Sequence, residues 1–186
     1  GPFASIDVSK TSAFTTEGPN TVLHVEFDVN LNNYETAATP YAVMLGDGSE
    51  YSAVGLCFDP NTRTIKKLSS NANVYNNGIV LSYFKEFEPT AVSYEFNRWY
   101  KMKLVVKVTN DTGYARKYDL YIDGVKVVED EPFYQLESAA ISDIKFWCNS
   151  GGSANNKDTM AVANVSVFVE KQDVGVPAPA DRSALI

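Results

Sequence analysis

The chain has 186 residues, of which 45% are hydrophobic, and a formal net charge of −7. A chain of this length and composition is typical of one folded domain with a sizeable core, and it is too apolar to be disordered. The acidity argues against nucleic acid, an anionic membrane surface or a strongly polyanionic glycan as the partner, because such partners need clustered Lys and Arg. No apolar run approaches the roughly 18 residues that a membrane span requires.

The predicted elements are β-strands separated by turns. The clearest strand covers residues 21–31, where apolar and polar residues alternate with the period of two that a half-buried strand requires. The apolar positions, which we expect in the core, are Leu23, Val25, Phe27, Val29 and Leu31. The opposite positions, which we expect on a solvated face, are Val22, His24, Glu26, Asp28 and Asn30.

Other stretches rich in β-branched and aromatic residues predict further strands. They lie at residues 3–8, 41–45, 53–58, 79–84, 102–108, 118–122, 144–148 and 161–169. Turn sequences separate them, and the Asp123-Gly124 pair is typical of a tight hairpin between residues 118–122 and 125–128. The only helical signal is a short stretch around residues 133–140.

This succession of short strands predicts an all-β fold, either a sandwich or a barrel. We expect one domain over residues 1–172, followed by a linker-like tail over residues 173–186, where Pro and Ala recur. Cys57 and Cys148 each lie inside an apolar strand, which favours buried free thiols; a disulfide remains open if those strands face one another.

Two segments carry a family resemblance. Residues 97–106, with Trp99 near the start of a strand, precede residues 117–124, which contain the pattern Y-x-x-Y-I-D-G. This pairing resembles the centre of concanavalin A-like, laminin-G-like jelly rolls, and residues 141–146 and 162–167 are similar to the last two strands of that superfamily. The resemblance implies a two-sheet antiparallel β-sandwich with Trp99 in the core.

The functions that this resemblance implies are varied. The superfamily includes lectins, carbohydrate-binding modules, glycoside hydrolases, polysaccharide lyases and adhesion domains, and many bacterial versions are appended to secreted polysaccharide-degrading enzymes. Ala163-Asn164 replaces an Asp-Asn pair that is frequent in the closing strand of the relatives, which argues against a family-type calcium site there. Fold alone does not decide among these functions.

Candidate catalytic groups are few. A glycosidase needs two carboxylates around the scissile bond, and the E-x-D-x-x-E strand motif of the hydrolases in this superfamily does not occur. Glu26 and Asp28 point the same way from one strand, and His24, the only histidine, shares their face. We interpret this face as solvated surface; a catalytic site around the three residues is the second interpretation.

Aromatic residues give the binding hypothesis, because sugar rings stack on flat side chains while their hydroxyls need short polar partners. Strand alternation assigns Ile144, Phe146 and Cys148 to the core and places Trp147 with Asn149 on the other face. The predicted carbohydrate-binding residues are Trp147 and Asn149, with Tyr83, Tyr51, Tyr75 and Asp47 from other strands and loops. Each tyrosine has a second interpretation as ordinary core or rim.

The sequence therefore favours a non-catalytic carbohydrate-binding module that recognises a polysaccharide, secreted and monomeric as an isolated domain. The alternatives are a lyase or hydrolase of the same fold and an adhesion domain that binds protein. Structural calcium is an open expectation, with loop carboxylates as its candidate ligands: Asp47, Glu50, Asp111 and Asp158. The opening Gly1-Pro2 looks like a protease scar, so an export signal is expected to have been removed.

Overall fold

The computed structural model describes residues 3–7, 21–32, 41–46, 52–68, 87–107, 116–133, 141, 143–148 and 159–171, and its secondary structure there is entirely β. The strands are β1 (Phe3–Asp7), β2 (Thr21–Asn32), β3 (Tyr41–Gly46), β4 (Ser52–Asp59), β5 (Thr64–Leu68), β6 (Phe87–Ser93), β7 (Trp99–Lys107), β8 (Lys117–Ile122), β9 (Val125–Pro132), β10 (Asp143–Cys148) and β11 (Thr159–Lys171).

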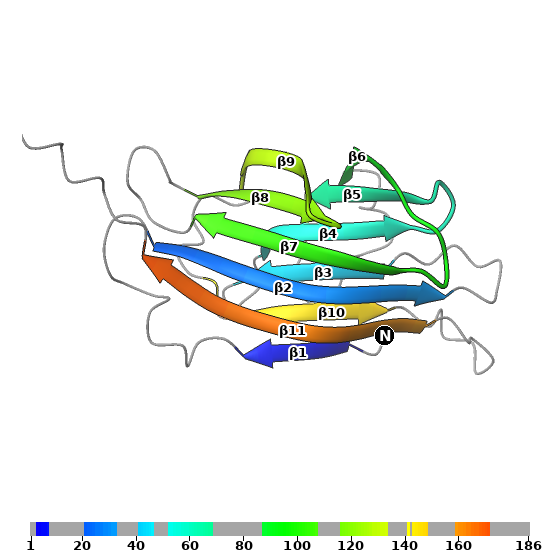
Figure 1. Cartoon of the computed structure of the whole chain (residues 1–186), viewed down its shortest axis with the longest axis horizontal. Helices are drawn as coiled ribbons and strands as arrows, with labels where there is room; N and C mark the ends of the chain where they lie inside the picture. The colour runs from blue at the N-terminus through cyan, green and yellow to red at the C-terminus, as the bar shows by residue number, and fades with distance from the viewer. Residues whose placement is uncertain are drawn as a thin grey trace, which may run out of the picture.

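These strands form two antiparallel sheets packed face to face (Figure 1). Sheet A has six strands in the order β1-β10-β3-β4-β5-β6, and sheet B has five in the order β11-β2-β7-β8-β9. Figure 1 looks onto sheet B, with sheet A behind it. Each sheet combines strands that follow one another in the chain, such as β3-β4 and β7-β8, with strands that are far apart in sequence, such as β10-β3 and β11-β2. The two-sheet antiparallel sandwich that the family resemblance implied is confirmed.

The core lies between the sheets and is built by strand alternation. Leu23, Val25, Phe27 and Val29 of β2 are all buried there, as predicted. The rings of Phe27 and Phe146 meet edge to face with their centroids 5.2 Å apart, which links β2 of sheet B to β10 of sheet A. The parity of β2 is therefore fixed, because a slip of one residue would turn Phe27 out of the core.

The hairpin between β8 and β9 also follows the prediction. Asp123 and Gly124 have φ angles of 50° and 81°, the left-handed values that both central residues of a type I′ turn require. The tip is fastened to the start of β7, since the Asp123 backbone N–H donates to the Lys101 carbonyl at 2.8 Å and the Lys101 N–H donates to Asp123 Oδ1 at 2.9 Å.

Two strands that the sequence did not predict complete one side of sheet A. β5 is only five residues long and contains two lysines, and β6 contains Pro89. Neither has the apolar character by which strands are recognised. β6 is the last strand of the sheet, an edge position that tolerates a proline because its outward side needs no N–H donor. The predicted strand at residues 79–84 lies outside the described residues.

A second apolar cluster lies on the face of sheet A that points away from sheet B. It consists of Ala42, Met44, Cys57, Leu68 and Phe87, all buried, with Trp147 packed against them half-buried. Gly55 belongs to this layer, because a Cβ at that position would lie 2.9 Å from Met44 Sδ and 3.1 Å from Leu68 Cβ.

The strand order separates the two cysteines. Cys57 of β4 pairs with Ala42 and Cys148 of β10 pairs with Tyr41, so β3 lies between them. Two strand spacings amount to about 9.5 Å, whereas the Cα atoms of a disulfide lie within about 7 Å. Cys57 is a buried free thiol, and burial raises its pKa well above the ordinary value, which makes it unreactive.

Candidate functional site

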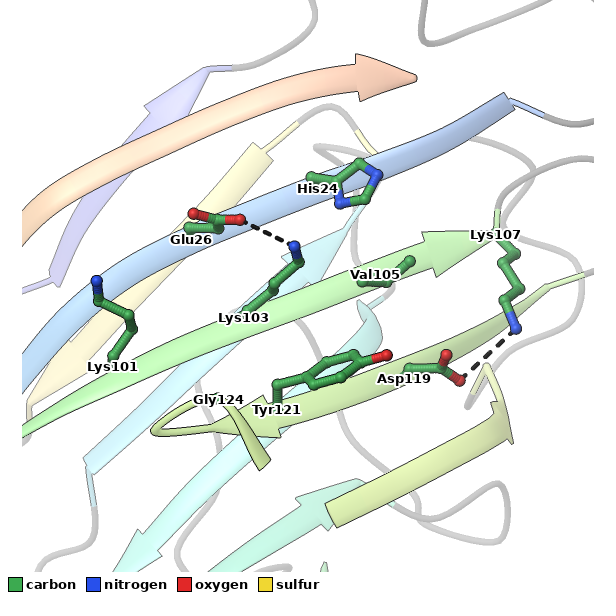
Figure 2. Close-up of a pocket in the computed structure, with 9 residues that line it drawn as sticks. All are labelled: His24, Glu26, Lys101, Lys103, Val105, Lys107, Asp119, Tyr121 and Gly124. Atoms are coloured by element: carbon green, nitrogen blue, oxygen red, sulfur yellow. Dashed lines mark ion pairs between the residues drawn. The ribbon is translucent and has the colours of Figure 1, made fainter. Parts of the chain in front are cut away.

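A hollow of about 610 Å³ opens on the face of sheet B that points away from the core (Figure 2). Strands β2, β7 and β8 and the hairpin tip supply its lining residues: His24, Glu26, Lys101, Lys103, Val105, Lys107, Asp119, Tyr121 and Gly124. Strand parity brings them together, since Tyr100, Met102, Leu104 and Val106 of β7 are buried in the core and the residues between them project outward.

The charges in this hollow are arranged as ion pairs across the strands. Glu26 Oε1 lies 3.1 Å from Lys103 Nζ, and Asp119 Oδ1 lies 3.6 Å from Lys107 Nζ; both pairs are drawn in Figure 2. Asp119 is buried and also accepts from the Asp130 backbone N–H at 2.8 Å and from Lys126 at 3.3 Å. Both lining carboxylates are therefore already engaged by protein donors.

The contacts of Lys107 stabilise its charge. Burial lowers its pKa, but the hydrogen bond to Asp130 and the charge of Asp119 more than offset this, and the pKa lies above its ordinary value. Lys107 is consequently a permanent cation at neutral pH, and its role is to hold β7 against β8 and β9.

We predicted that His24 would be solvated on the outer face of β2. It does point to that face, but its side chain is buried, since the residue is only 8% exposed. Its Nε2 lies 2.7 Å from Glu170 Oε2, and its ring stacks on Phe168 with centroids 4.6 Å apart. Both partners belong to β11, in which a bulge between Ala163 and Ser166 shifts the register by one residue. The shift reverses the side-chain parity beyond the bulge, so Phe168 falls on the outer face beside His24.

A residue of the bulge also binds the carboxylate of Asp28. Asn164 has a φ of 52° at the bulge, and its Nδ2 donates to Asp28 Oδ2 at 2.6 Å. Glu26 and Asp28 do share the outer face, as the alternation of β2 predicted, but each carboxylate has its own partner in the structure. The three residues of the catalytic alternative, His24, Glu26 and Asp28, are thus individually engaged.

The two tryptophans differ in exposure. The family resemblance implied that Trp99 lies in the core, and this is wrong. Trp99 is 51% exposed at the start of β7, on the same face as Lys101 and Lys103. Trp147 lies on the outer face of sheet A, opposite to Phe146, which the alternation of β10 predicted, and it packs half-buried against the second cluster. The other predicted sugar-contacting residues lie outside the described residues: Asn149, Tyr83, Tyr51, Tyr75 and Asp47.

No group of three or more His, Cys, Asp or Glu side chains in the described residues is arranged to hold a metal ion. The loop carboxylates considered as calcium ligands, Asp47, Glu50, Asp111 and Asp158, lie outside those residues. In the same described ranges, no helix has the length and apolarity of a membrane span.

Comparison with known proteins reveals similar structures but no similar sequences. No family model matches the chain, and no curated protein does. A sialidase structure superposes with a TM-score of 0.56 at 14% identity, over 92% of this chain and 14% of the sialidase. An alginate lyase from Corynebacterium sp. superposes with a TM-score of 0.52 at 12% identity, over 90% of this chain and 62% of the lyase.

A tetrameric galectin from Cinachyrella sp., a ball sponge, has a TM-score of 0.53 at 10% identity, over 90% of this chain and 99% of the galectin. These structures share their fold with the chain, in agreement with the β-sandwich that the resemblance to concanavalin A-like jelly rolls implied. The chain spans only a small part of the sialidase and nearly all of the galectin, so the same fold serves as part of a larger protein and as a whole chain.

Proposed function

We propose that this protein is a non-catalytic carbohydrate-binding module and that the hollow on the outer face of sheet B is its binding site. The observation that carries the proposal is the lining: the ring of Tyr121 lies in an open hollow among amines and carboxylates. A sugar presents apolar C–H faces to an aromatic ring and hydroxyls to charged donors and acceptors, so this combination suits it.

The absence of catalysis is inferred from how the hollow's acidic and basic groups are used. A hydrolase needs one carboxyl group poised as an acid and a second free as base or nucleophile. Here Glu26 is paired with Lys103, and Asp119 is buried between two lysines and a backbone N–H. Both carboxylates therefore serve as structural anions, and a sugar hydroxyl can bind to their outer edges without bond cleavage.

A polysaccharide lyase is the second candidate, and one observation favours it: His24 and Tyr121, which could serve as base and acid, line the same hollow as three lysines. Against it, the His24 ring is covered by Phe168 and bonded to Glu170. A rise in ultraviolet absorbance on incubation with uronate polymers, abolished in His24→Ala, would establish the lyase and overturn the non-catalytic proposal.

The proposal also covers where the protein works and whether it is part of a larger protein. Sialidase, alginate lyase and galectin are names of glycan-active or glycan-binding proteins, and the chain corresponds to 14% of the sialidase. We infer that the protein works outside the cell, as one module of a larger glycan-active protein.

A glycan microarray tests the function, and calorimetry on the strongest ligand tests the site. We expect Tyr121→Ala to weaken binding roughly tenfold. Val125→Ala is the matched control, because Val125 is 63% exposed on the adjacent strand and does not line the hollow. Loss of binding in Trp147→Ala with full binding in Tyr121→Ala would move the site to sheet A. An array without any ligand would favour the protein-binding alternative.

A further inference from the structure

The lining of the hollow contains three lysines but only two carboxylates, so one lysine has no acidic partner within the lining. It contains Lys101, Lys103 and Lys107 as cations but only Glu26 and Asp119 as carboxylates. Glu26 pairs with Lys103 and Asp119 with Lys107, and among the described residues no ion pair reaches Lys101. Figure 2 shows the same arrangement, with the Lys101 side chain next to the Glu26–Lys103 pair and the Lys107–Asp119 pair at the other end of the hollow.

The acidic groups nearest to Lys101 in the sheet are engaged elsewhere. Asp28 is its partner across β2 and β7, and the Asp28 carboxylate accepts from Asn164 at 2.6 Å. Asp123 accepts from the Lys101 backbone N–H through Oδ1, while its Oδ2 lies 3.2 Å from Arg98 Nη2. The backbone of Lys101 is thus held at both its N–H and its carbonyl, and its exposed ammonium group is available to a ligand.

Trp99 extends this surface beyond the hollow. It lies two residues before Lys101 on the same face of β7, a separation of about 7 Å along a strand. Its partner on β2 is Asn30, whose partner on β11 is Ala161, a residue too small to cover the indole. A half-exposed indole beside an amide is the combination that stacks on one sugar ring and bonds its hydroxyls.

We infer that the site recognises a glycan containing an acidic sugar, with its carboxylate on Lys101 and the adjoining sugar ring on Trp99. This inference rests on the proposed function and names its ligand class. It is compatible with the net charge of −7, because one carboxylate meets one free ammonium group. A densely charged polyanion would instead meet Glu26, Asp28 and Asp119.

The test uses matched acidic and neutral ligands in calorimetry. One probe is an oligosaccharide with a single uronic acid, compared with its carboxyl-reduced form. A second is sialyllactose, compared with lactose. We expect one acidic probe to bind about tenfold more tightly than its neutral counterpart and the difference to shrink as salt is added. The two pairs distinguish a uronic from a nonulosonic acid as the source of the carboxylate.

The variants assign the contacts. Lys101→Gln should weaken binding of the acidic probe roughly tenfold and leave the neutral one almost unchanged, while Lys101→Arg should retain the preference. Lys117→Gln is the charge control, because Lys117 lies on the face of β8 that carries Asp119 and Tyr121 but does not line the hollow. Trp99→Ala should weaken both probes about three- to tenfold.

The failures of the two proposals are distinguishable. Equal affinity for acidic and neutral probes, with binding still lost in Tyr121→Ala, would overturn the acidic-sugar inference and leave the carbohydrate-binding function in place. An undiminished preference in Lys101→Gln, or unchanged binding in Trp99→Ala, would overturn the assignment of that contact. Absence of binding to every glycan on the array would overturn both proposals.

Discussion

The outward faces of the two sheets have opposite characters. On sheet A the outward face carries the buried apolar cluster around Met44 and Cys57, and Trp147 packs against it. On sheet B the outward face carries lysines, carboxylates and an open hollow. Trp99 lies on the same face outside the hollow and is half-exposed. A tryptophan that projects away from the core is therefore not necessarily exposed, because it can pack against a second apolar cluster.

The comparison also separates two ways of stabilising an outward face. Sheet A combines close packing, which leaves no room for a side chain at Gly55, with an ion pair between Lys66 and Asp59 at the end of β4. Sheet B uses cross-strand ion pairs, of which Asp119 with Lys107 and Lys126 is the most buried. Packing of the first kind excludes ligands, whereas charged pairs leave polar groups at the surface with which a ligand can interact.

The largest effect is expected at Asp119. Asp119→Ala removes the buried carboxylate that accepts from the Asp130 N–H and from two lysines, and it leaves the part-buried Asp130 N–H without its acceptor. We expect the free energy of unfolding to fall by about 2–4 kcal/mol, measured by urea denaturation. Glu129→Ala, which removes an exposed partner of Lys126, should cost less than about 0.5 kcal/mol. Equal losses in both variants would contradict the structural role of Asp119.

Gly55 tests the packed layer of sheet A. Gly55→Ala places a Cβ within 2.9 Å of Met44 Sδ and 3.1 Å of Leu68 Cβ, so the layer must shift. Overpacking of this kind should destabilise the fold by about 1–3 kcal/mol. The double variant Gly55→Ala with Met44→Ala should lose less stability than the sum of the two single variants, because the closest contact is gone. A stable single variant would show that the layer is loosely packed.

The two tryptophans sharpen the comparison directly. Trp147→Ala should lower the free energy of unfolding by about 1–3 kcal/mol, since the indole packs on buried side chains, whereas Trp99→Ala should change it by less than about 0.5 kcal/mol. Denaturation of both variants, read beside their glycan affinities, separates a packing role from a binding role. Equal stability losses would remove the structural distinction between the two faces.

Strand parity accounts for what the sequence could predict. Parity correctly predicts Phe27 in the core and Trp147 opposite to Phe146. Applied to β7, it also predicts Trp99 on the outer face with Lys101, whereas the family resemblance implied a core position for Trp99. The burial of His24 could not be predicted in this way, because the bulge at Asn164 that brings Phe168 over it leaves no reliable mark in the sequence.

The hollow itself was missed because it is a property of paired strands. Lys101, Asp119 and Tyr121 are unremarkable along the chain, and only the register of β2, β7 and β8 brings them beside Glu26. The alternation of lysines in β7 was the one available signal, since three charges on a single strand face predict a polar outer surface. Their cross-strand acidic partners depend on long-range pairing that a single sequence does not specify.

The smallest expected effect concerns acid stability, which also differs between the sheets. Asp59 at the end of β4 in sheet A is partly buried; this raises its pKa, but hydrogen bonds from Lys66, Asn61 and Thr62 outweigh the burial and hold the pKa below its ordinary value. Asp130 in sheet B also has a lowered pKa, caused mainly by Lys107, but its side chain is half exposed.

A lowered folded-state pKa means that the unfolded chain binds the proton first as pH falls. Each carboxylate thus contributes stability that is complete above its unfolded pKa and lost as pH falls through the folded value. We expect Asp59→Asn to be less stable than wild type by about 1 kcal/mol at neutral pH, and the gap to close as the pH falls through the lowered pKa of Asp59 in the folded state. Asp130→Asn should show a smaller gap that salt removes, because solvent screens an exposed pair. Urea midpoints between neutral and acid pH measure both gaps, and a larger, salt-resistant gap for Asp130 than for Asp59 would contradict the assignment of the less exposed of these two pairs to Asp59.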